Sequence, residues 1–351
     1  MIFSCQRSPR YASYATRGAR SEDSAIAAPV SRGILAFGLL CLALGASSAS
    51  CDTYPSRTVR VIVPFSTGGP DTVARVMAQA LAAQTGQPFV VDNRPGANGI
   101  IGAEAVAKSR PDGYTLLLTS SSFIVNPSMY RKLPYDTLKD FAPVTQITAA
   151  GGLLLVVSPS IPAQSVKELI ALARKPDSRL SFGSPGIGNT NHLTGELFNA
   201  RAGIKMLHVP YKGGGQAIAA LLAGDIQVAF ASSALSLPYV RADRLRALAY
   251  TGRARASYLP DVPTMIEAGV PDFEVDSGWQ GLYAPADCPG EIVAKLHGEV
   301  LAALANPQVR ERISALGLEP VGSTPAEFRL FVQAEIKKYA EMVHAAGIQP
   351  E

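Results

Sequence analysis

A glycine-rich loop at residues 183–192 has the residue types that bind an anion. Its sequence is Gly-Ser-Pro-Gly-Ile-Gly-Asn-Thr-Asn-His, and it joins the strand-like run Leu180–Phe182 to a helical pattern that continues through Leu193 and Leu197. Glycines let the backbone turn tightly and approach a ligand. N–H groups in the first turn of a helix lack intrahelical partners, and the helix dipole favours negative charge there. The loop therefore predicts an anion site that needs no cationic side chain, with an ordinary strand-to-helix connection as the alternative.

Several residues of this loop are candidate ligand contacts. Asn189 and Thr190 both suit the N-cap position, so the helix is expected to begin at one of them. Ser184 adds a hydroxyl, and Gly188 adds a backbone N–H close to the helix start. His192 could donate to a ligand, or it could instead be a capping or core histidine.

A second turn repeats the same arrangement about 120 residues earlier in the chain. The strand pattern Val59–Phe65 leads into Ser-Thr-Gly-Gly-Pro-Asp at 66–71, and a helical pattern follows. Asp71 could act as a general base, but a helix N-cap is the favoured interpretation. The ligand contacts predicted from this turn are Phe65, Ser66, Thr67, Gly68 and Gly69.

Two more polar turns follow apolar strands. Tyr114–Thr119 is followed by three serines, and Ile226–Phe230 is followed by Ala-Ser-Ser. Alternating strands and helices imply parallel crossovers, and open α/β sheets bind ligands beyond the carboxyl ends of their strands. The predicted contacts from these turns are Ser120, Ser121, Ser122 and Ser232.

The order of the patterns predicts two α/β lobes. Residues 52–153 together with 279–351 should form lobe 1, and residues 154–278 should form lobe 2. The chain would then cross between the lobes near 153–158 and near 279–284, and two crossings permit a hinge. Trp279 would either stack on a ligand or plug the second crossing. A capping box at Thr324–Glu327 begins a long amphipathic helix that we expect to pack on lobe 1.

The charge balance excludes some classes of partner. The 351 residues carry a formal charge of +4, but five arginines and two acidic residues lie within the first 50. The remaining chain has 27 basic and 26 acidic residues. A nearly neutral protein gives no electrostatic reason to expect nucleic-acid or anionic-membrane binding.

The N-terminal segment, residues 1–49, is typical of an export signal. Arginines precede a 14-residue apolar run at 33–46, which is too short to span a bilayer comfortably, and small residues follow it. We expect cleavage after Ala49 and a periplasmic protein. Lipidation at Cys51 is the alternative, disfavoured because Ser48 stands where such sites usually carry leucine.

Several familiar chemistries have no signature in the sequence. The nucleotide-binding, zinc-protease and serine-hydrolase motifs do not occur, and no histidine has a second histidine at metal-ligand spacing. Neither a cofactor nor a metal is therefore expected. We expect Cys288 to be a partly buried thiol without a catalytic role. A disulfide bond to Cys51 is the alternative in an exported protein.

The motifs together resemble the periplasmic solute receptors of the tripartite tricarboxylate transporter family, often called Bug receptors. The resemblance runs from about Tyr54 to the C-terminus. Its marks are Val63-Pro64-Phe65 with Gly68-Gly69, Asp71–Arg75, Asn93–Ala97 with Gly99, Pro111–Leu116, the 183–192 loop with Leu193 and Glu196, Val209–Gly213, Leu259–Thr264, and Glu267-Ala268-Gly269.

The resemblance implies an α/β, two-lobed periplasmic-binding-protein architecture of the type II kind, with the ligand in the interlobe cleft. It also implies a binding protein, not an enzyme, that captures a small carboxylate-bearing metabolite, works as a monomer and delivers its ligand to membrane transporter subunits. A ligand-sensing antenna for a receptor kinase would have the same sequence signature, and a periplasmic enzyme is a further alternative. The turns at 66–69, 120–122 and 184–190 contain no Lys, Arg or His. We therefore expect backbone N–H groups, hydroxyls and amides to hold the carboxylate.

Overall fold

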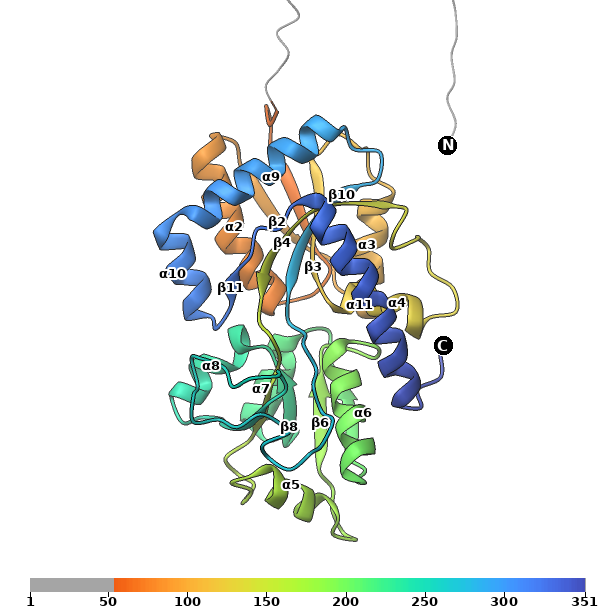
Figure 1. Ribbon diagram of the computed structural model, residues 1–351, viewed down its shortest axis with the longest axis vertical. Helices are drawn as coiled ribbons and strands as arrows, with labels where there is room; N and C mark the ends of the chain where they lie inside the picture. Colours follow the sequence, from red (N-terminus) through yellow and green to blue (C-terminus); the bar gives the residue numbers. More distant parts are fainter. Residues whose placement is uncertain (1–53, 351) are drawn as a thin grey trace, which may run out of the picture. The chain divides into compact units, whose positions relative to one another are not determined.

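Two twisted sheets organise the chain, which the computed structural model describes from residue 54 to residue 350 (Figure 1). These residues belong to one compact unit. The expected export signal, its cleavage site and Cys51 fall outside the described residues. Among the described helices, none combines the length and apolarity required to span a bilayer.

The first sheet has six strands in the order β11-β4-β10-β3-β1-β2. Strand β1 pairs in parallel with β2 and β3, whereas β10 lies antiparallel between β3 and β4. The strands are β1 (Val59–Val63), β2 (Phe89–Asn93), β3 (Thr115–Ser120), β4 (Phe141–Ala149), β10 (Gln280–Pro285) and β11 (Glu319–Pro320).

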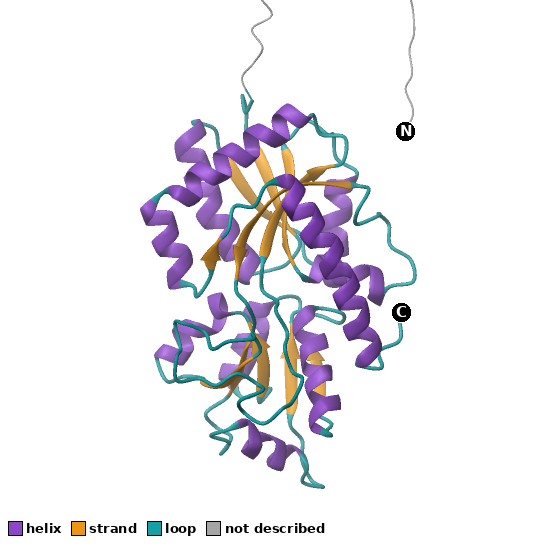
Figure 2. Cartoon of the chain, in the orientation of Figure 1, coloured by secondary structure: helices purple, strands orange, loops and turns teal. Residues whose placement is uncertain are grey.

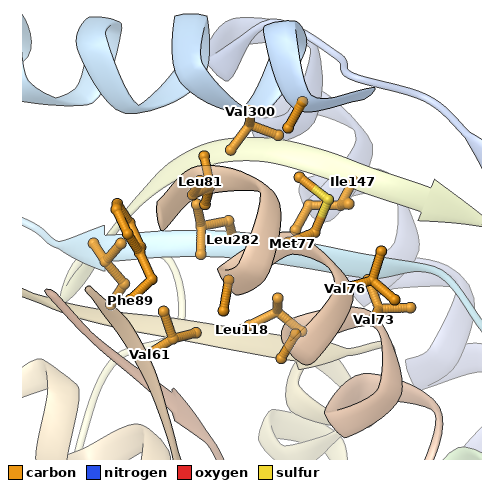
Figure 3. Packing of buried hydrophobic residues seen from close by; sticks show 14 of the residues in the cluster. Val61, Val73, Val76, Met77, Leu81, Phe89, Leu118, Ile147, Leu282 and Val300 are labelled. Atoms are coloured by element: carbon orange, nitrogen blue, oxygen red, sulfur yellow. The ribbon is translucent and has the colours of Figure 1, made fainter. Parts of the chain in front are cut away.

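Side-chain alternation along the central strands supplies a core on each face of this sheet. Val61 and Leu118 point to the layer of α2, α9 and α10 (Figure 3). Ile62 and Leu117 point to the layer of α3, α4 and α11. Successive strand residues face opposite sides, so strands buried on both faces read as continuous apolar runs. The helices are α2 (Gly69–Thr85), η1 (Ala97–Gly99), α3 (Ile100–Ala107), α4 (Ser122–Met129), α9 (Gly290–Ala305), α10 (Pro307–Ala315) and α11 (Pro325–Ala345).

The second sheet has five strands in the order β7-β6-β8-β5-β9. Leu155 and Val157 face the layer of α5 and α6, and Leu154 and Val156 face the layer of α7 and α8. Strand β6 is parallel to β7 and β8, whereas β5 is antiparallel to β8 and β9. The elements are β5 (Leu154–Val157), α5 (Val166–Ala173), β6 (Ser181–Ser184), α6 (Thr190–Ala202), β7 (Leu207–Pro210), α7 (Gly214–Ala223), β8 (Val228–Ala231), α8 (Ser233–Arg241) and β9 (Arg246–Tyr250).

The chain crosses between the sheets twice, once after Ala149 and once between Tyr250 and Gln280 (Figure 2). Thr251 ties the crossings together: its hydroxyl accepts from the Leu153 N–H and donates to the Val275 carbonyl, each over 2.8 Å. These connections join the two lobes, and residues of both lobes line the cavity described below.

The structure confirms the expected α/β fold and most of its predicted elements, with two corrections. Strand β4 did not stand out in the sequence, and β5 and β10 run antiparallel to neighbours that were expected to be parallel. The capping box at Thr324 is present, and α11 packs on α4 and β4 as expected, while also reaching α6. Trp279 is buried against Phe328 and Phe331 of α11, which agrees with the plug interpretation.

Candidate ligand-binding site

A cavity of about 60 Å³ lies between the lobes, where five helices begin. The helices α2, α4, α6, α7 and α8 all contribute their first residue or their N-cap to its wall. Because each helix start presents unpaired N–H groups and the positive end of a dipole, their convergence creates a site for negative charge. The residues at these starts are Gly68, Gly69, Ser121, Ser122, Asn189, Thr190, Gly214 and Ser232.

The junction of α4 and α6 gathers hydroxyl and amide groups from both lobes. Asn189 is the N-cap of α6, as predicted, and its Nδ2 donates to Ser122 Oγ over 2.6 Å. The Thr190 hydroxyl lies 3.4 Å from the hydroxyls of Ser121 and Ser122. These distances are long for hydroxyl hydrogen bonds, so the Thr190 hydroxyl is available to a ligand that enters the cavity. The Ser122 hydroxyl accepts from Asn189 and can still donate its own proton to a ligand.

Two buried asparagines support this junction from behind. Asn98 Nδ2 donates to Asn126 Oδ1 over 2.8 Å, and Asn98 Oδ1 accepts from Asn189 over 3.4 Å. Asn126 in turn donates to the Tyr135 hydroxyl over 3.1 Å. The amide chain fixes the orientation of Asn189, which the sequence alone could not reveal because the partners lie on separate elements.

The start of α2 differs from the expectation for Asp71. The N-cap is Gly68, so the prediction that Asp71 caps the helix is wrong. Asp71 lies in the first turn instead, is 5% exposed, and accepts hydrogen bonds from Arg75 and Asn93 over distances close to 3 Å. The carboxylate is therefore part of a structural ion pair beside the cavity and does not reach its wall.

Residues 66 and 67 link the lobes at the edge of the cavity. The Ser66 hydroxyl donates to the Lys212 carbonyl over 3.2 Å, and the Gly215 N–H donates to the Thr67 carbonyl over 2.9 Å. Both residues were predicted to contact the ligand, but the structure does not bring them to the cavity wall. Their contacts instead join the β1–α2 turn of one lobe to the start of α7 in the other.

Ser184, Gly188 and His192 lie behind the wall and shape the loop that forms it. The Ser184 hydroxyl is 2.6 Å from His208 Nε2, and the Gly188 N–H donates to His192 Nδ1 over 3.1 Å. The two imidazoles stack with centroids 3.9 Å apart. These contacts favour the core-histidine interpretation of His192 over direct ligand contact.

Burial keeps both imidazoles neutral. Desolvation lowers the pKa of His192 to about 4, and desolvation together with the neighbouring His192 lowers the pKa of His208 to about 3. An unprotonated His192 Nδ1 is also what the Gly188 N–H requires as an acceptor. The pair therefore acts as an uncharged support under the loop at 184–189.

The remaining predicted contacts do line the cavity, and the structure adds residues that the sequence did not single out. Phe65, Ser120 and Ser232 join the helix-start residues on the wall. Gln280 lines it from β10, where its side chain is held by the Thr148 hydroxyl and by the Gly278 carbonyl. Asn191 lines it from α6 and donates to the Phe230 carbonyl over 2.6 Å. The sequence offered a signal for both amides, because Asn191 follows Thr190 and Gln280 follows Trp279, two residues already singled out.

Charged side chains stay away from the cavity. Within residues 54–350, its wall contains no lysine, arginine, histidine, aspartate or glutamate. Arg94 pairs with Asp92 over 3.0 Å, and the Lys212 side chain is exposed. The described chain also has no group of acidic, histidine or cysteine side chains able to hold a metal ion. Cys288 is buried, and burial together with nearby Asp112 raises its pKa to about 11.

Comparison with known proteins identifies the family. The family model for the tripartite tricarboxylate transporter family receptor matches residues 73–348. The chain belongs to this family. It is a family of periplasmic solute-binding receptors and not of enzymes.

Individual receptors of known sequence or structure are similar over nearly their whole length. Protein BugT of Bordetella pertussis is 39% identical over 305 residues, which covers 86% of this chain and 93% of that protein. The periplasmic binding protein BugD superposes with a TM-score of 0.82 at 32% identity, covering 85% of this chain and 100% of that one. Two Rhodopseudomonas palustris structures contain carboxylates: one with adipate (TM-score 0.81, 36% identity, 85% and 100% coverage) and MatC with malate (0.78, 34%, 83% and 100%). These comparisons confirm the Bug-receptor resemblance and the two-lobed fold.

Proposed function

We propose that this receptor captures a small carboxylate-bearing metabolite in the periplasm and delivers it, as a monomer, to the membrane subunits of a tripartite tricarboxylate-type transporter. The observation that carries the proposal is the convergence of five helix starts on one small cavity without charged side chains. Related receptors with adipate and malate support the ligand class.

The ligand carboxylate would lie at the α4–α6 junction. Ser121, Ser122 and Thr190 offer hydroxyl donors there, and the first turns of both helices offer backbone N–H groups. Hydrogen bonds to a charged acceptor contribute about 1.5–3 kcal/mol each in a desolvated site. Several such bonds replace the counter-ion that the cavity wall does not provide.

A thermal-shift screen tests the ligand class. Small mono-, di- and tricarboxylates are compared with their primary amides, which keep the shape but lose the charge. A ligand that binds the folded state raises the melting temperature according to its concentration and affinity. We expect shifts from acids and not from amides; equal shifts from both, or shifts from neutral solutes alone, would remove the proposal.

The protein partner that the ligand-bound receptor recruits distinguishes a transport role from a sensing role. A pull-down from membranes in the presence of the ligand identified by the screen should recover the transporter subunits. Recovery of a receptor kinase in their place would assign the antenna role instead.

Removal of the export signal predicts a specific N-terminus for the mature protein. Cleavage after Ala49 leaves Ser50 at the N-terminus of the periplasmic protein. Intact mass and N-terminal sequencing of protein recovered from the periplasm measure this directly. A diacylglyceryl mass on Cys51 would show a lipoprotein instead.

A further inference from the structure

The first turn of α8 contacts the ligand cavity and also packs against lobe 1. Ser232, the N-cap of α8, and Leu235 both line the cavity. Between them, the Ser233 hydroxyl donates to the Gly317 carbonyl over 3.0 Å, and Ala234 packs into the core cluster of α2, α9 and α10. One helical turn therefore connects the cavity wall to lobe 1, although α8 belongs to the layer that covers the second sheet.

The hydrogen bond between Ser233 and Gly317 joins the two lobes. Gly317 lies between α10 and β11 of lobe 1, and both residues are buried. A buried carbonyl that loses its donor is not rehydrated, so breaking this bond is unfavourable while the lobes stay in contact. The bond therefore favours the arrangement in which the start of α8 is docked on lobe 1.

The absence of a side chain at residue 317 allows this close approach. Gly317 has a φ of 69°, and a Cβ atom there would lie 2.8 Å from Ser233 Cβ and 2.9 Å from Tyr258 Cε1. At the cavity wall, a Cβ atom on Gly69 would lie 3.2 Å from Ser232 Oγ. Lobe 1 thus approaches the first turn of α8 closely at two points, one at the cavity wall and one behind it.

We propose that Ser233 is a positioning residue for ligand capture: its bond to Gly317 forms as the cleft closes and holds the start of α8 at the cavity wall. The inference rests on the proposed function, because it concerns closure around a bound ligand. Ser233 itself does not line the cavity. Ligand affinity should therefore depend on a hydroxyl group that never contacts the ligand.

Two serine variants test this role. Ser233→Ala removes the bond between the lobes, whereas Ser236→Ala removes a bond within α8, from the fully buried Ser236 hydroxyl to the Ser232 carbonyl over 2.9 Å. Each variant loses one buried hydroxyl bond, so both should lower the melting temperature of the ligand-free receptor to a similar extent. Only Ser233→Ala should also weaken ligand binding.

Calorimetric titration of the mature receptor measures that difference. The probes are adipate and malate, the acids present in two related structures, and the neutral diamide succinamide. For each probe that binds the wild type, we expect Ser233→Ala to bind about three- to tenfold more weakly, and Ser236→Ala to bind like the wild type. Equal affinities of the two variants overturn the proposal.

A glycine pair tests the same contact from lobe 1. Gly317→Ala places a methyl group against Ser233 and Tyr258, so the docked position of α8 becomes overpacked. Gly86→Ala is the matched control, because Gly86 has nearly the same φ, 70°, and a Cβ there meets nothing within 4 Å. We expect Gly317→Ala to bind the probes about tenfold more weakly than Gly86→Ala. Equal binding by these two variants contradicts the role of the contact.

The probes distinguish failure of this inference from failure of the proposed function. If the acids bind both serine variants equally, carboxylate capture stands and only the role of Ser233 is wrong. If succinamide binds and the acids do not, the proposed function falls, and the succinamide affinities decide the role of Ser233. If none of the three binds, small-angle scattering of the ligand-free variants decides it: Ser233→Ala should have the larger radius of gyration, and equal radii overturn the inference.

Discussion

At the scale of single residues, Thr190 has a hydroxyl that the protein itself holds only weakly. The Thr190 Oγ1 atom lies 3.4 Å from the hydroxyl oxygens of Ser121 and Ser122 and from Asn191 Oδ1. These distances exceed the usual range for hydrogen bonds of a hydroxyl group. Thr190→Val keeps the shape and removes the donor, so we expect ligand affinity to fall by about 1–3 kcal/mol. Calorimetric titration measures the loss.

Lys212→Gln is the control for this prediction. The Lys212 side chain is exposed, so removing its charge should weaken binding by about 1 kcal/mol or less. If Lys212→Gln abolished binding while Thr190→Val preserved it, an ion pair and not the helix starts would hold the carboxylate.

The sequence identified residue types better than their orientation. Asn189 and Thr190 were predicted correctly as the helix start because capping is a local property. Ser184 and His192 are in the same loop, yet they turn towards His208 and Gly188 instead of the cavity. Which way a side chain turns depends on partners from distant strands, and a single sequence does not record them.

At the scale of elements, the stacked histidine pair makes the 184–189 loop sensitive to acid. In the unfolded chain, histidine titrates near pH 6.5, whereas burial lowers the pKa of His192 to about 4 in the folded protein. Between these values the unfolded state binds more protons, so the free energy of unfolding should fall as pH falls from about 6.5 towards 4. We expect each histidine of the pair to contribute up to about 3 kcal/mol to this loss.

Denaturant titrations at several pH values measure this slope. Burial raises the pKa of Glu196, 3.7 Å from His192 Nε2, and this acts in the opposite direction, so variants are needed to isolate the histidines. His192→Gln retains an acceptor for the Gly188 N–H but cannot titrate, and it should flatten the slope. His344→Gln, at an exposed position on α11, is the control. If His192→Gln left the dependence of the unfolding free energy on pH unchanged, groups other than His192 would cause the acid sensitivity.

Elements with strong local signals were predictable, and those defined by long-range pairing were not. The apolar runs of β1, β3 and β5 and the capping box of α11 are visible in the sequence. Strand β4 carries Pro143 and several polar residues, which interrupt its apolar pattern although most of the strand is buried. Its position beside β10 depends on the chain's return from the second lobe, which lies more than 130 residues away.

At the scale of the whole molecule, two glycines of lobe 2, Gly213 and Gly215, allow the lobes to approach each other closely. A Cβ on Gly213 would lie 2.0 Å from Ser66 Oγ, and one on Gly215 would lie 2.4 Å from Thr67 Oγ1 and 3.0 Å from the Thr67 carbonyl. The close contact across the cleft is therefore possible because these positions lack side chains.

Gly215→Ala should oppose closure of the cleft while leaving lobe 2 intact. Gly215 lies inside α7, where alanine is favoured over glycine, so the change is harmless to the helix itself. Across the cleft, the added methyl group meets Thr67, and overpacking of this kind costs about 1–3 kcal/mol. We expect ligand affinity to fall by a corresponding factor.

Small-angle scattering together with calorimetry tests whether this loss arises from closure. The wild-type receptor should show a smaller radius of gyration at saturating ligand, and Gly215→Ala should contract less. Gly298→Ala is the matched control, because a Cβ there meets nothing within 4 Å, and it should bind and contract like the wild type. If Gly215→Ala bound with wild-type affinity and contracted fully, the contact between Gly215 and Thr67 would be incidental. The two crossings that Thr251 ties together would then have to set the closed state by themselves.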